Sequence, residues 1–455
     1  MYLSTSVHLT NNNKDNVDIN VLKHLAYHSA RIYNVGLYNV RQHFFNTGQY
    51  LSYNDNHTQS NQNENYALLT TDLSQQTLRL VDHDMKAFFK LLKAKKMGKY
   101  SFPVRLPRYK DKEGMMPFAV QGRSCRIQKD GKVAIGLTEE FRTLYGIPYK
   151  RFFLTIPKNL SDVKQFKEMR FKPIHNGNEF KVEFVYESAD VRHVERVSEN
   201  ANGYLSIDIG VNNLMACSLF SNGESHQFII DGRHIKAINH RYNKEKARLQ
   251  SEYSKNKSIN GMDTKRFRRI SNARLNKIDD YFNKAVSYLM KVCKAYDVGT
   301  IVIGYNKGQK QMINNGKENN QNFVCIPFHR LRSKLMYKCE LFGITYAPQE
   351  ESYTSQASCL DMDFIPTYGE EDAKDVTFSG KRKKRGLYKS GDGSLLNADI
   401  NGSVNILRKY LENERKGNAL SADSVRALVN VPVERITTFP EAPSFRWGVV
   451  DQPTL

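Results

Sequence analysis

The chain has 455 residues, 40% of them hydrophobic, which is enough for two or three domains with substantial cores. Its 68 Lys and Arg residues exceed its 47 Asp and Glu residues by 21, and such a surplus indicates a polyanionic partner, most often nucleic acid. It contains no apolar run long enough to cross a membrane, and its first residues lack the pattern of a signal peptide, so we expect a cytoplasmic protein without a membrane partner.

The N-terminal part predicts a helical hairpin that interrupts a small antiparallel barrel or sandwich. Residues 2–10 have the pattern of a short strand. An apolar stripe predicts a helix from about Asp18, and a second helix is expected from about Asp72 to Lys96. The segment Asn46–Tyr66 is rich in Asn, Gln and Ser and predicts a loop. Between Ser124 and Tyr186, short apolar strands alternate with turn signals.

An extended basic segment, Phe102–Lys112, lies between the second helix and these strands. Its prolines restrict the backbone, and cations project from it, which suits contacts with phosphate groups. A solvated basic loop would explain the segment equally well. The candidate nucleic-acid ligands here are Arg105, Arg108, Lys110 and Lys112.

The stretch Leu205–Asn213 alternates apolar and polar residues and predicts a strand that ends at Gly210. Asp208 lies on the face opposite the apolar residues. A buried acid at the end of a core strand is costly unless it is paired or holds a metal. On this stretch alone, a solvated or capping Asp208 is the simpler interpretation.

The elements that follow predict the order strand, strand, helix, strand, helix, strand, loop and helix. They are Leu214–Phe220, Phe228–Ile230, a long helical region at 232–296, Thr300–Gly304, Phe328–Phe342, Ile344–Ala347, a basic loop at 361–397, and a last helix from Asn397 to about Leu411. The long helical region carries a basic arm of Arg266, Arg268, Arg269, Arg274 and Lys277. The tail, 413–455, contains four prolines and little periodicity, which predicts disorder over most of it.

This order of elements is ribonuclease-H-like. It allows Asp208 on the central strand to meet Asp399 at the start of the last helix, with a third acid supplied by a neighbouring strand. Converging carboxylates repel one another, and a divalent cation relieves that repulsion. Two Mg²⁺ ions about 4 Å apart could activate a water and stabilise the leaving oxygen of a phosphodiester. The alternative is three unrelated surface acids among 47.

Four ordered motifs add a family resemblance: SIDIGVNNL (206–214), IVIGYNKGQKQ (301–311), EESYTSQAS (350–358) and NADINGSVNILRK (397–409). Together they resemble the TnpB family of transposon-associated, RNA-guided DNA endonucleases, which are similar to compact type V CRISPR effectors. The resemblance implies an α/β chain with a RuvC nuclease domain at 199–412. It also implies a wedge-like β-barrel at 1–15 and 98–198, with an inserted helical recognition lobe at 16–97.

The same resemblance implies an activity and its partners. The expected protein is a Mg²⁺-dependent endodeoxyribonuclease that binds a guide RNA and double-stranded target DNA beside a short adjacent motif. It would act as a monomer with its RNA, associated with the bacterial nucleoid. The expected catalytic, Mg²⁺-binding residues are Asp208, Glu351 and Asp399.

The third acid departs from the usual family pattern. Most members have Glu at the end of the fourth strand, where this chain has Gly304, but some carry it on the next strand, just before a Thr-Ser pair. Glu351, three residues before Thr354, matches that placement. Neighbouring strands lie about 4.8 Å apart, so a Glu side chain can reach across one strand. Glu350 is the fallback, and we expect only one of the two to enter the site because adjacent strand residues face opposite ways.

The cysteines mark a second departure. Members usually have a four-cysteine zinc ribbon before the last Asp, but here Cys359 stands alone. The six cysteines contain no C-x-x-C pair, so we predict buried thiols and no structural zinc. Nucleic-acid contacts are expected instead from the basic loop and from one further lysine: Lys381, Arg382, Lys383, Lys384, Arg385 and Lys310.

Two other functions stay open. An RNA-guided repressor that has lost cleavage is favoured by Gly304, although Asp208 and Asp399 are intact. A strict DNA transposase would use the same fold and the same three acids, and the family resemblance argues against it.

Overall fold

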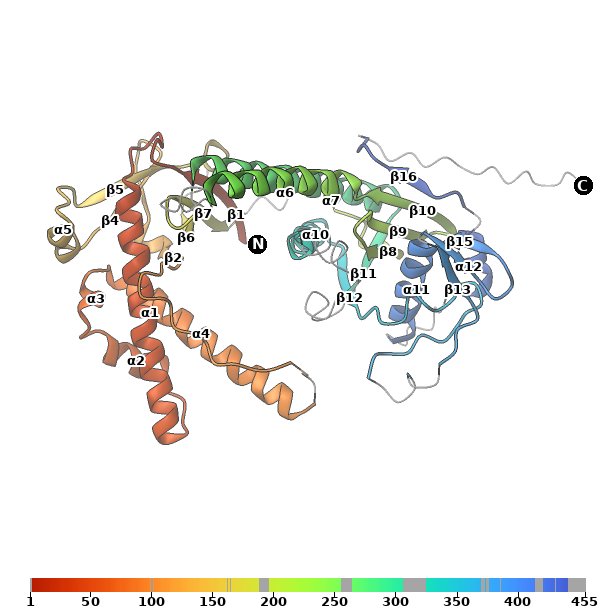
Figure 1. Cartoon of the computed structure of the whole chain (residues 1–455), viewed down its shortest axis with the longest axis horizontal. Coiled ribbons are helices and arrows are strands. Elements are labelled where there is room, and N and C mark those ends of the chain that lie inside the picture. The colour runs from red at the N-terminus through yellow and green to blue at the C-terminus, as the bar shows by residue number, and fades with distance from the viewer. Residues whose placement is uncertain are drawn as a thin grey trace, which may run out of the picture. The chain divides into compact units, whose positions relative to one another are not determined.

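The computed structural model describes residues 2–98, 100, 102–161, 163, 165–187, 196–254, 264–305, 325–369, 373, 376–384, 386–413, 420–429 and 431–440. The chain forms two compact units, Met1–Val191 and Arg192–Leu455 (Figure 1). Both contain helices and strands, which confirms the mixed α/β class. The limits of the wedge, lobe and nuclease regions stay predictions. None of the described helices is both long enough and apolar enough to span a bilayer.

The first unit contains two antiparallel sheets that share one hydrophobic core. The larger sheet has the order β1-β7-β6-β2, and the smaller has the order β3-β4-β5. Large aromatic side chains such as Phe171, Phe180 and Phe184 are fully buried between these elements. The strands are β1 (Tyr2–Leu9), β2 (Phe118–Gln121), β3 (Arg126–Ile127), β4 (Lys132–Gly136), β5 (Arg151–Thr155), β6 (Phe166–Ile174) and β7 (Glu179–Glu187), with α5 (Glu139–Tyr145) and the short turns η1 (Gly122–Ser124) and η2 (Lys158–Leu160) between them.

Two long helices of this unit confirm the predicted hairpin. They are α1 (Ile19–Thr47) and α4 (Thr71–Lys96), which pack against each other. The predicted loop at 46–66 is wrong in part, because it contains α2 (Tyr53–Ser60) and α3 (Glu64–Ala67). The Ser52 hydroxyl and the Asn63 amide cap these helices, so residues that indicated a loop instead serve as N-caps.

The second unit is built on a six-stranded sheet with the order β12-β11-β8-β9-β10-β16. Strands β8, β9 and β10 pair antiparallel in sequence order, while β11 and β12 run parallel to β8. The strands are β8 (Gly203–Ile209), β9 (Asn213–Ser221), β10 (Glu224–Asp231), β11 (Val298–Gly304), β12 (Thr345–Gln349) and β16 (Glu434–Ile436). The first five of these strands follow one another in the predicted chain order, and β8, the predicted central strand, has a partner on each side.

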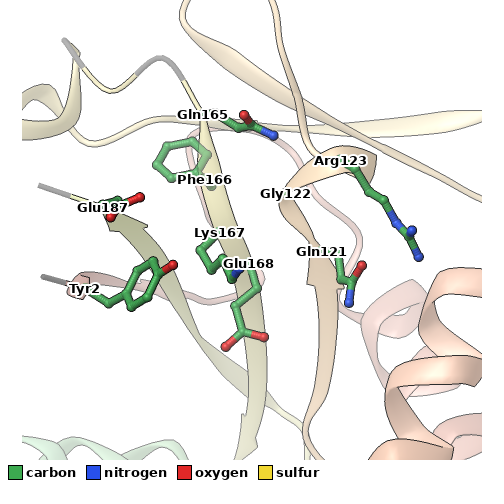
Figure 2. Close-up of a pocket in the computed structure, with 9 residues that line it drawn as sticks. All are labelled: Tyr2, Gln121, Gly122, Arg123, Gln165, Phe166, Lys167, Glu168 and Glu187. Atoms are coloured by element: carbon green, nitrogen blue, oxygen red, sulfur yellow. The ribbon is translucent and has the colours of Figure 1, made fainter.

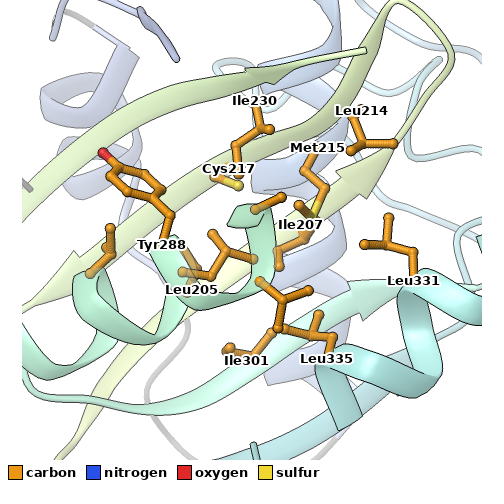
Figure 3. Close-up of a cluster of buried hydrophobic side chains, with 14 of the residues drawn as sticks. Leu205, Ile207, Leu214, Met215, Cys217, Ile230, Tyr288, Ile301, Leu331 and Leu335 are labelled. Carbon is orange, nitrogen blue, oxygen red and sulfur yellow. The ribbon is translucent and has the colours of Figure 1, made fainter. Parts of the chain in front are cut away.

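Helices cover both faces of this sheet. On one face, Leu205, Ile207 and Ile301 pack against Leu331 and Leu335 (Figure 3). On the other face, the sheet packs against the last long helix in two further apolar clusters. The helices are α6 (Arg233–Ser254), α7 (Lys265–Ala295), α10 (Phe328–Phe342) and α11 (Ala398–Asn413). Asp208, which alternates with the apolar residues of β8, therefore faces α11.

Two C-terminal predictions need correction. The basic loop contains a three-stranded antiparallel sheet, β13 (Lys381–Lys384), β14 (Leu387–Lys389) and β15 (Leu395–Asn397), anchored by the fully buried Tyr388. The tail is ordered at α12 (Ala422–Val429) and at β16, which pairs in parallel with β10. Ile436 stabilises this pairing because it is buried opposite Ile230.

Candidate active site

Asp208 lies near the end of β8, where the sheet meets α11. The contact is close because α11 has a glycine at the point of approach. A Cβ atom at Gly402 would lie 2.8 Å from Asp208 Oδ2, nearer than carbon and oxygen normally come. The absence of a side chain at this position therefore lets the helix pack directly over the Asp208 carboxylate.

Glu351 occupies the space left open by Gly304. A Cβ atom at Gly304 would overlap Glu351 Oε2 and would lie 3.2 Å from Glu351 Cδ and 2.8 Å from Ile406 Cδ1. Strand β11 neighbours β8, with Ile303 opposite Ile207, so position 304 is adjacent to Asp208 across the sheet. The structure thus places the Glu351 carboxylate where a side chain on β11 would otherwise begin.

Asp399 lies in the first turn of α11. The Asn397 Oδ1 atom accepts hydrogen bonds from the backbone N–H of Asp399, at 2.9 Å, and of Ile400, at 3.3 Å, and so starts the helix. Asp399 Oδ2 accepts a hydrogen bond from Asn213 Nδ2 at 2.5 Å. Its Oδ1 atom pairs with Arg382 of β13 at 3.2 Å. Both carboxylate oxygens are therefore held in position.

The three acids are electrostatically coupled. Burial raises the pKa of Asp208 well above its usual range, and the charges of Glu351 and Asp399 raise it further. Arg382 and the backbone N–H of Ile209 oppose this shift in pKa. Some surface of Asp208 remains accessible, but protein atoms crowd its carboxylate, and we attribute the shift to that crowding.

These three acids suit a hard divalent cation, because carboxylate oxygens are the ligands that such a cation prefers. The nearby positive charge of Arg382 does not fully offset the repulsion among their negative charges. As they stand, no three His, Cys, Asp or Glu side chains in the described part of the chain are arranged closely enough to hold a metal ion. In this arrangement Asn213 and Arg382 bind the Asp399 carboxylate. Cation binding by all three acids would therefore require these side chains to move closer together.

Glu350 and Glu351 have different surroundings, although the predicted reason does not apply. Both residues follow β12, which ends at Gln349, so they do not alternate along a strand. The Glu350 carboxylate instead pairs with Lys409 Nζ at 2.5 Å and accepts a hydrogen bond from the Ser352 N–H at 2.9 Å. The structure brings Glu351 to Asp208 and directs Glu350 to Lys409.

Sequence reasoning missed several residues that organise this site. Asn213 donates a hydrogen bond to Asp399, and Lys409 forms an ion pair with Glu350. Gly402 leaves space for the Asp208 carboxylate because it has no side chain. A signal for part of this was present, because Asn401, Asn405 and Lys409 recur every four residues and so share one face of α11.

The basic segment 102–112 is fixed to α1. Arg31 donates hydrogen bonds to the carbonyls of Asp111 and Lys112, and Asn34 exchanges two hydrogen bonds with the backbone of Lys110. Lys110 Nζ lies 4.5 Å from the centre of the Tyr33 ring. Lys110 is therefore partly used in packing, whereas the other three predicted ligands are exposed: Arg105, Arg108 and Lys112.

The other predicted nucleic-acid ligands are similarly divided. In the basic arm on α7, Arg274 hydrogen-bonds Asn239 and the Cys325 carbonyl, and Arg266 pairs with Glu245 at 3.3 Å. Arg268 is half-buried, while the remaining two cations of the arm are exposed. All four residues Lys381–Lys384 are exposed as well, including Arg382, which pairs with Asp399. Lys310 and Arg385 lie outside the described residues.

The cysteines partly follow the prediction. Among the described residues, Cys325 is only half-buried, whereas the other five cysteines are buried. All six are free thiols, and the prediction of no structural zinc stays a prediction.

Two cavities lie apart from the three acids. A polar pocket of about 440 Å³ in the first unit is formed where four strand ends meet, and its lining includes Tyr2, Arg123 and Lys167 (Figure 2). A second pocket of about 360 Å³ lies between α6 and α7 beside Arg274 and Lys277. The polar pocket contains none of the predicted site residues.

Several solved structures of RNA-guided effectors resemble the chain. A Cas12f1 complex with single guide RNA and target DNA shares 14% identity over 85% of this chain and 82% of that one, with a TM-score of 0.47. A CRISPR-Cas12f ternary complex shares 14% identity over 87% and 83%, with a TM-score of 0.34. The mini-RNA-guided endonuclease CRISPR-Cas_phi3 shares 10% identity over 90% and 92%, with a TM-score of 0.42.

Comparison with curated protein sequences finds no match. Two family models do match. The OrfB_IS605 model, described as a probable transposase, matches residues 183–310, which include β8, β9 and β11. The Cas12f1-like TNB domain model matches residues 328–406, which include Glu351 and Asp399. One part of the chain therefore resembles the OrfB_IS605 family, the TnpB family that its motifs also resemble, and a later part resembles the Cas12f1-like TNB domain.

Proposed function

We propose that this protein is an RNA-guided DNA endonuclease that hydrolyses phosphodiesters at Asp208, Glu351 and Asp399. The observation that carries the proposal is the coupling of Asp208 to the other two carboxylates at the contact between β8 and α11. Clustered, mutually repelling acids in a half-buried position are costly to stability, which favours a functional reason for them. The match of residues 183–310 to the OrfB_IS605 model supports the same conclusion.

Each residue has a distinct part in the proposed site. Asp208, Glu351 and Asp399 would hold Mg²⁺, with two ions expected, and when bound these ions would stabilise phosphate charge and activate water. Asn213 and the Asn397 cap orient Asp399. Arg382 lies beside Asp399 on an exposed strand, where its guanidinium can contact a phosphate of the DNA strand.

The partners proposed are a guide RNA and double-stranded target DNA. Pairing with the guide would read the target, and the protein would read a short adjacent duplex motif and the nucleic-acid backbone. The surplus of 21 positive charges supports binding to both. The exposed cations proposed to contact phosphates are Arg105, Arg108, Lys112, Arg269, Lys277, Lys381, Lys383 and Lys384. The wedge, lobe and nuclease layout, and a monomer bound to its RNA, belong to the same proposal.

The test begins with the RNA that co-purifies when the protein is expressed with its native flanking DNA. One discrete RNA, structured at one end and carrying flanking sequence at the other, would supply the guide. Cleavage of a matched target in Mg²⁺ is then compared between the wild type and Asp208→Ala. We expect Asp208→Ala to bind target but not cut it.

A matched control is Asp280→Ala on α7. The Asp280 side chain is 62% exposed and pairs with Lys284 one turn away, so its loss is expected to leave cleavage unchanged. Equal cutting by the wild type and Asp208→Ala would contradict the proposed site. Target binding without any cutting by the wild type would favour the repressor.

A strict DNA transposase is the second candidate, because the matching family model is described as a probable transposase. The same three acids would serve strand transfer. Joined DNA products formed from transposon ends without RNA would establish this function, and recovery of only random cellular RNA would favour it.

A further inference from the structure

One face of α11 carries one acid of the proposed site and lies beside the other two. Asp399 lies in its first turn, Gly402 faces Asp208, and Ile406 borders the space between Gly304 and Glu351. Lys409 follows three residues later on the same face, as helical spacing requires. The helix thus extends from the acids to the loop that carries Glu351.

Lys409 is a buried cation with a complete set of partners. Its side chain is only 3% exposed. The ammonium group donates to Glu350 Oε2 at 2.5 Å, to the Pro366 carbonyl at 2.8 Å and to the Ser352 carbonyl at 3.4 Å. A lysine ammonium has three donors, and here each has an acceptor. Burying such a group is costly unless it is paired in this way, so the arrangement is specific to this loop.

Two of these partners flank Glu351 directly in the chain. Lys409 binds the side chain of Glu350 and the backbone of Ser352, the residues before and after Glu351. A second set of contacts follows. Thr354 donates its hydroxyl to the Glu351 carbonyl at 2.9 Å, and Asn405 donates to the Thr354 carbonyl at 2.9 Å. The backbone around Glu351 is therefore fixed from α11 on both sides, at a point where β12 has already ended.

We propose that Lys409 is a positioning residue, which sets the backbone at Glu351 so that its carboxylate enters the space beside Gly304 and Asp208. This inference rests on the proposed function. Lys409 does not touch the reacting atoms and acts through Glu350 and Ser352. Its loss should therefore weaken Mg²⁺ binding by Glu351 and leave the binding of RNA and DNA intact.

The test compares Lys409→Met with Glu350→Gln/Lys409→Met in the full-length protein bound to its guide RNA. Lys409→Met removes the charge but keeps an unbranched side chain, and the double variant also removes the carboxylate that would otherwise lose its partner. The measurements are the single-turnover cleavage rate, the Mg²⁺ concentration for half-maximal cleavage, target-DNA affinity, and hydrogen exchange of the 350–358 amides. Arg330→Met is the matched control, because Arg330 pairs with Asp279 between α10 and α7.

We expect both Lys409 variants to cut about 10- to 100-fold more slowly and to need more Mg²⁺, as removal of groups that orient metal ligands commonly does. Exchange should increase at 350–358 alone, and target-DNA affinity and the Arg330→Met control should match the wild type. Wild-type cleavage rates and Mg²⁺ dependence in both variants would overturn the inference, as would faster exchange spread across the whole second unit.

The proposed function fails in a different way. If the wild type does not cut a guided target, or if Glu351→Ala cuts as fast as the wild type, the assigned reaction or the third acid is wrong. If Glu351→Ala is inactive while both Lys409 variants behave as the wild type, only the positioning role of Lys409 is wrong.

Discussion

Gly304→Ala tests whether Glu351 works where the structure places it. The new Cβ atom would overlap Glu351 Oε2 and press against Ile406 Cδ1 at 2.8 Å. Both are the far ends of side chains, so we expect these side chains to move while the backbone stays in place. A displacement of about 1 Å at a catalytic group can lower a rate roughly 100-fold, and we expect a loss of that order in guided cleavage.

Stability should change much less than activity. Inserting a methyl group into a packed core costs about 1–3 kcal/mol, and the mobility of both contacted atoms favours about 1 kcal/mol here. That corresponds to a decrease in melting temperature of about 2–4 °C for a unit of this size. The measurements are single-turnover cleavage with saturating guide and target, and calorimetric unfolding of the same preparation.

Gly136→Ala is the matched control, because a Cβ atom there meets no other atom within 4 Å. Cleavage by Gly304→Ala at the rate of this control would refute the placement of Glu351 in the site. A complementary variant, Gly304→Glu/Glu351→Ala, removes the obstructing carboxylate and supplies another from β11. We expect it to cut faster than Glu351→Ala alone, because position 304 is adjacent to Asp208 across the sheet.

Three further predictions concern stability and binding. The pKa of Asp208 is higher in the folded than in the unfolded protein, so the metal-free native state binds the Asp208 proton more tightly. The free energy of unfolding should therefore rise as the pH falls from 7 towards 4. In Asp208→Asn this pH-dependent rise should be missing from melting temperatures measured between pH 5 and 7. Ile436→Ala should lower the free energy of unfolding by about 2–4 kcal/mol in urea titration, whereas Val433→Ala, at a residue 37% exposed, should change it little; equal effects would argue against an ordered β16. Arg108→Ala should weaken nucleic-acid binding and reduce its salt dependence by about one counterion. Lys110→Ala should change the salt dependence less, because Lys110 packs on Tyr33. Filter binding across a salt series distinguishes the two variants.

The elements that could be predicted from the sequence are those whose buried apolar residues follow one another in a regular local pattern. The run Thr300–Gly304 is the end of β11, and the predicted helix Phe328–Phe342 has the same bounds in α10, which Gly343 ends with a left-handed conformation. Such elements are specified locally, because periodicity and a terminating glycine are both visible in a short window. By contrast, β16 forms because Ile436 meets Ile230, a residue far away in the chain. No local pattern encodes that pairing.

The candidate site was predictable only in part, for a related reason. Asp208 and Asp399 follow from their positions on a central strand and at a helix start, while Glu351 came from the family resemblance. In the sequence, Gly304 is only a missing side chain. In the structure it is the space that Glu351 fills, and that relation depends on the path of the chain after β12. Likewise, the pairing of Lys409 with Glu350 depends on how α11 packs against that loop.

The three acids differ in what holds them, and this difference predicts where the site is most easily disturbed. Asp208 belongs to a strand paired on both sides, and Asp399 to a capped first turn of a helix. Glu351 follows the last residue of β12 and depends on side-chain contacts from α11 to its neighbours. Backbone pairing resists single substitutions better than side-chain contacts do, because no one side chain provides it. Substitutions that lower activity without unfolding the protein should therefore be concentrated around the Glu351 loop and the face of α11 that holds it.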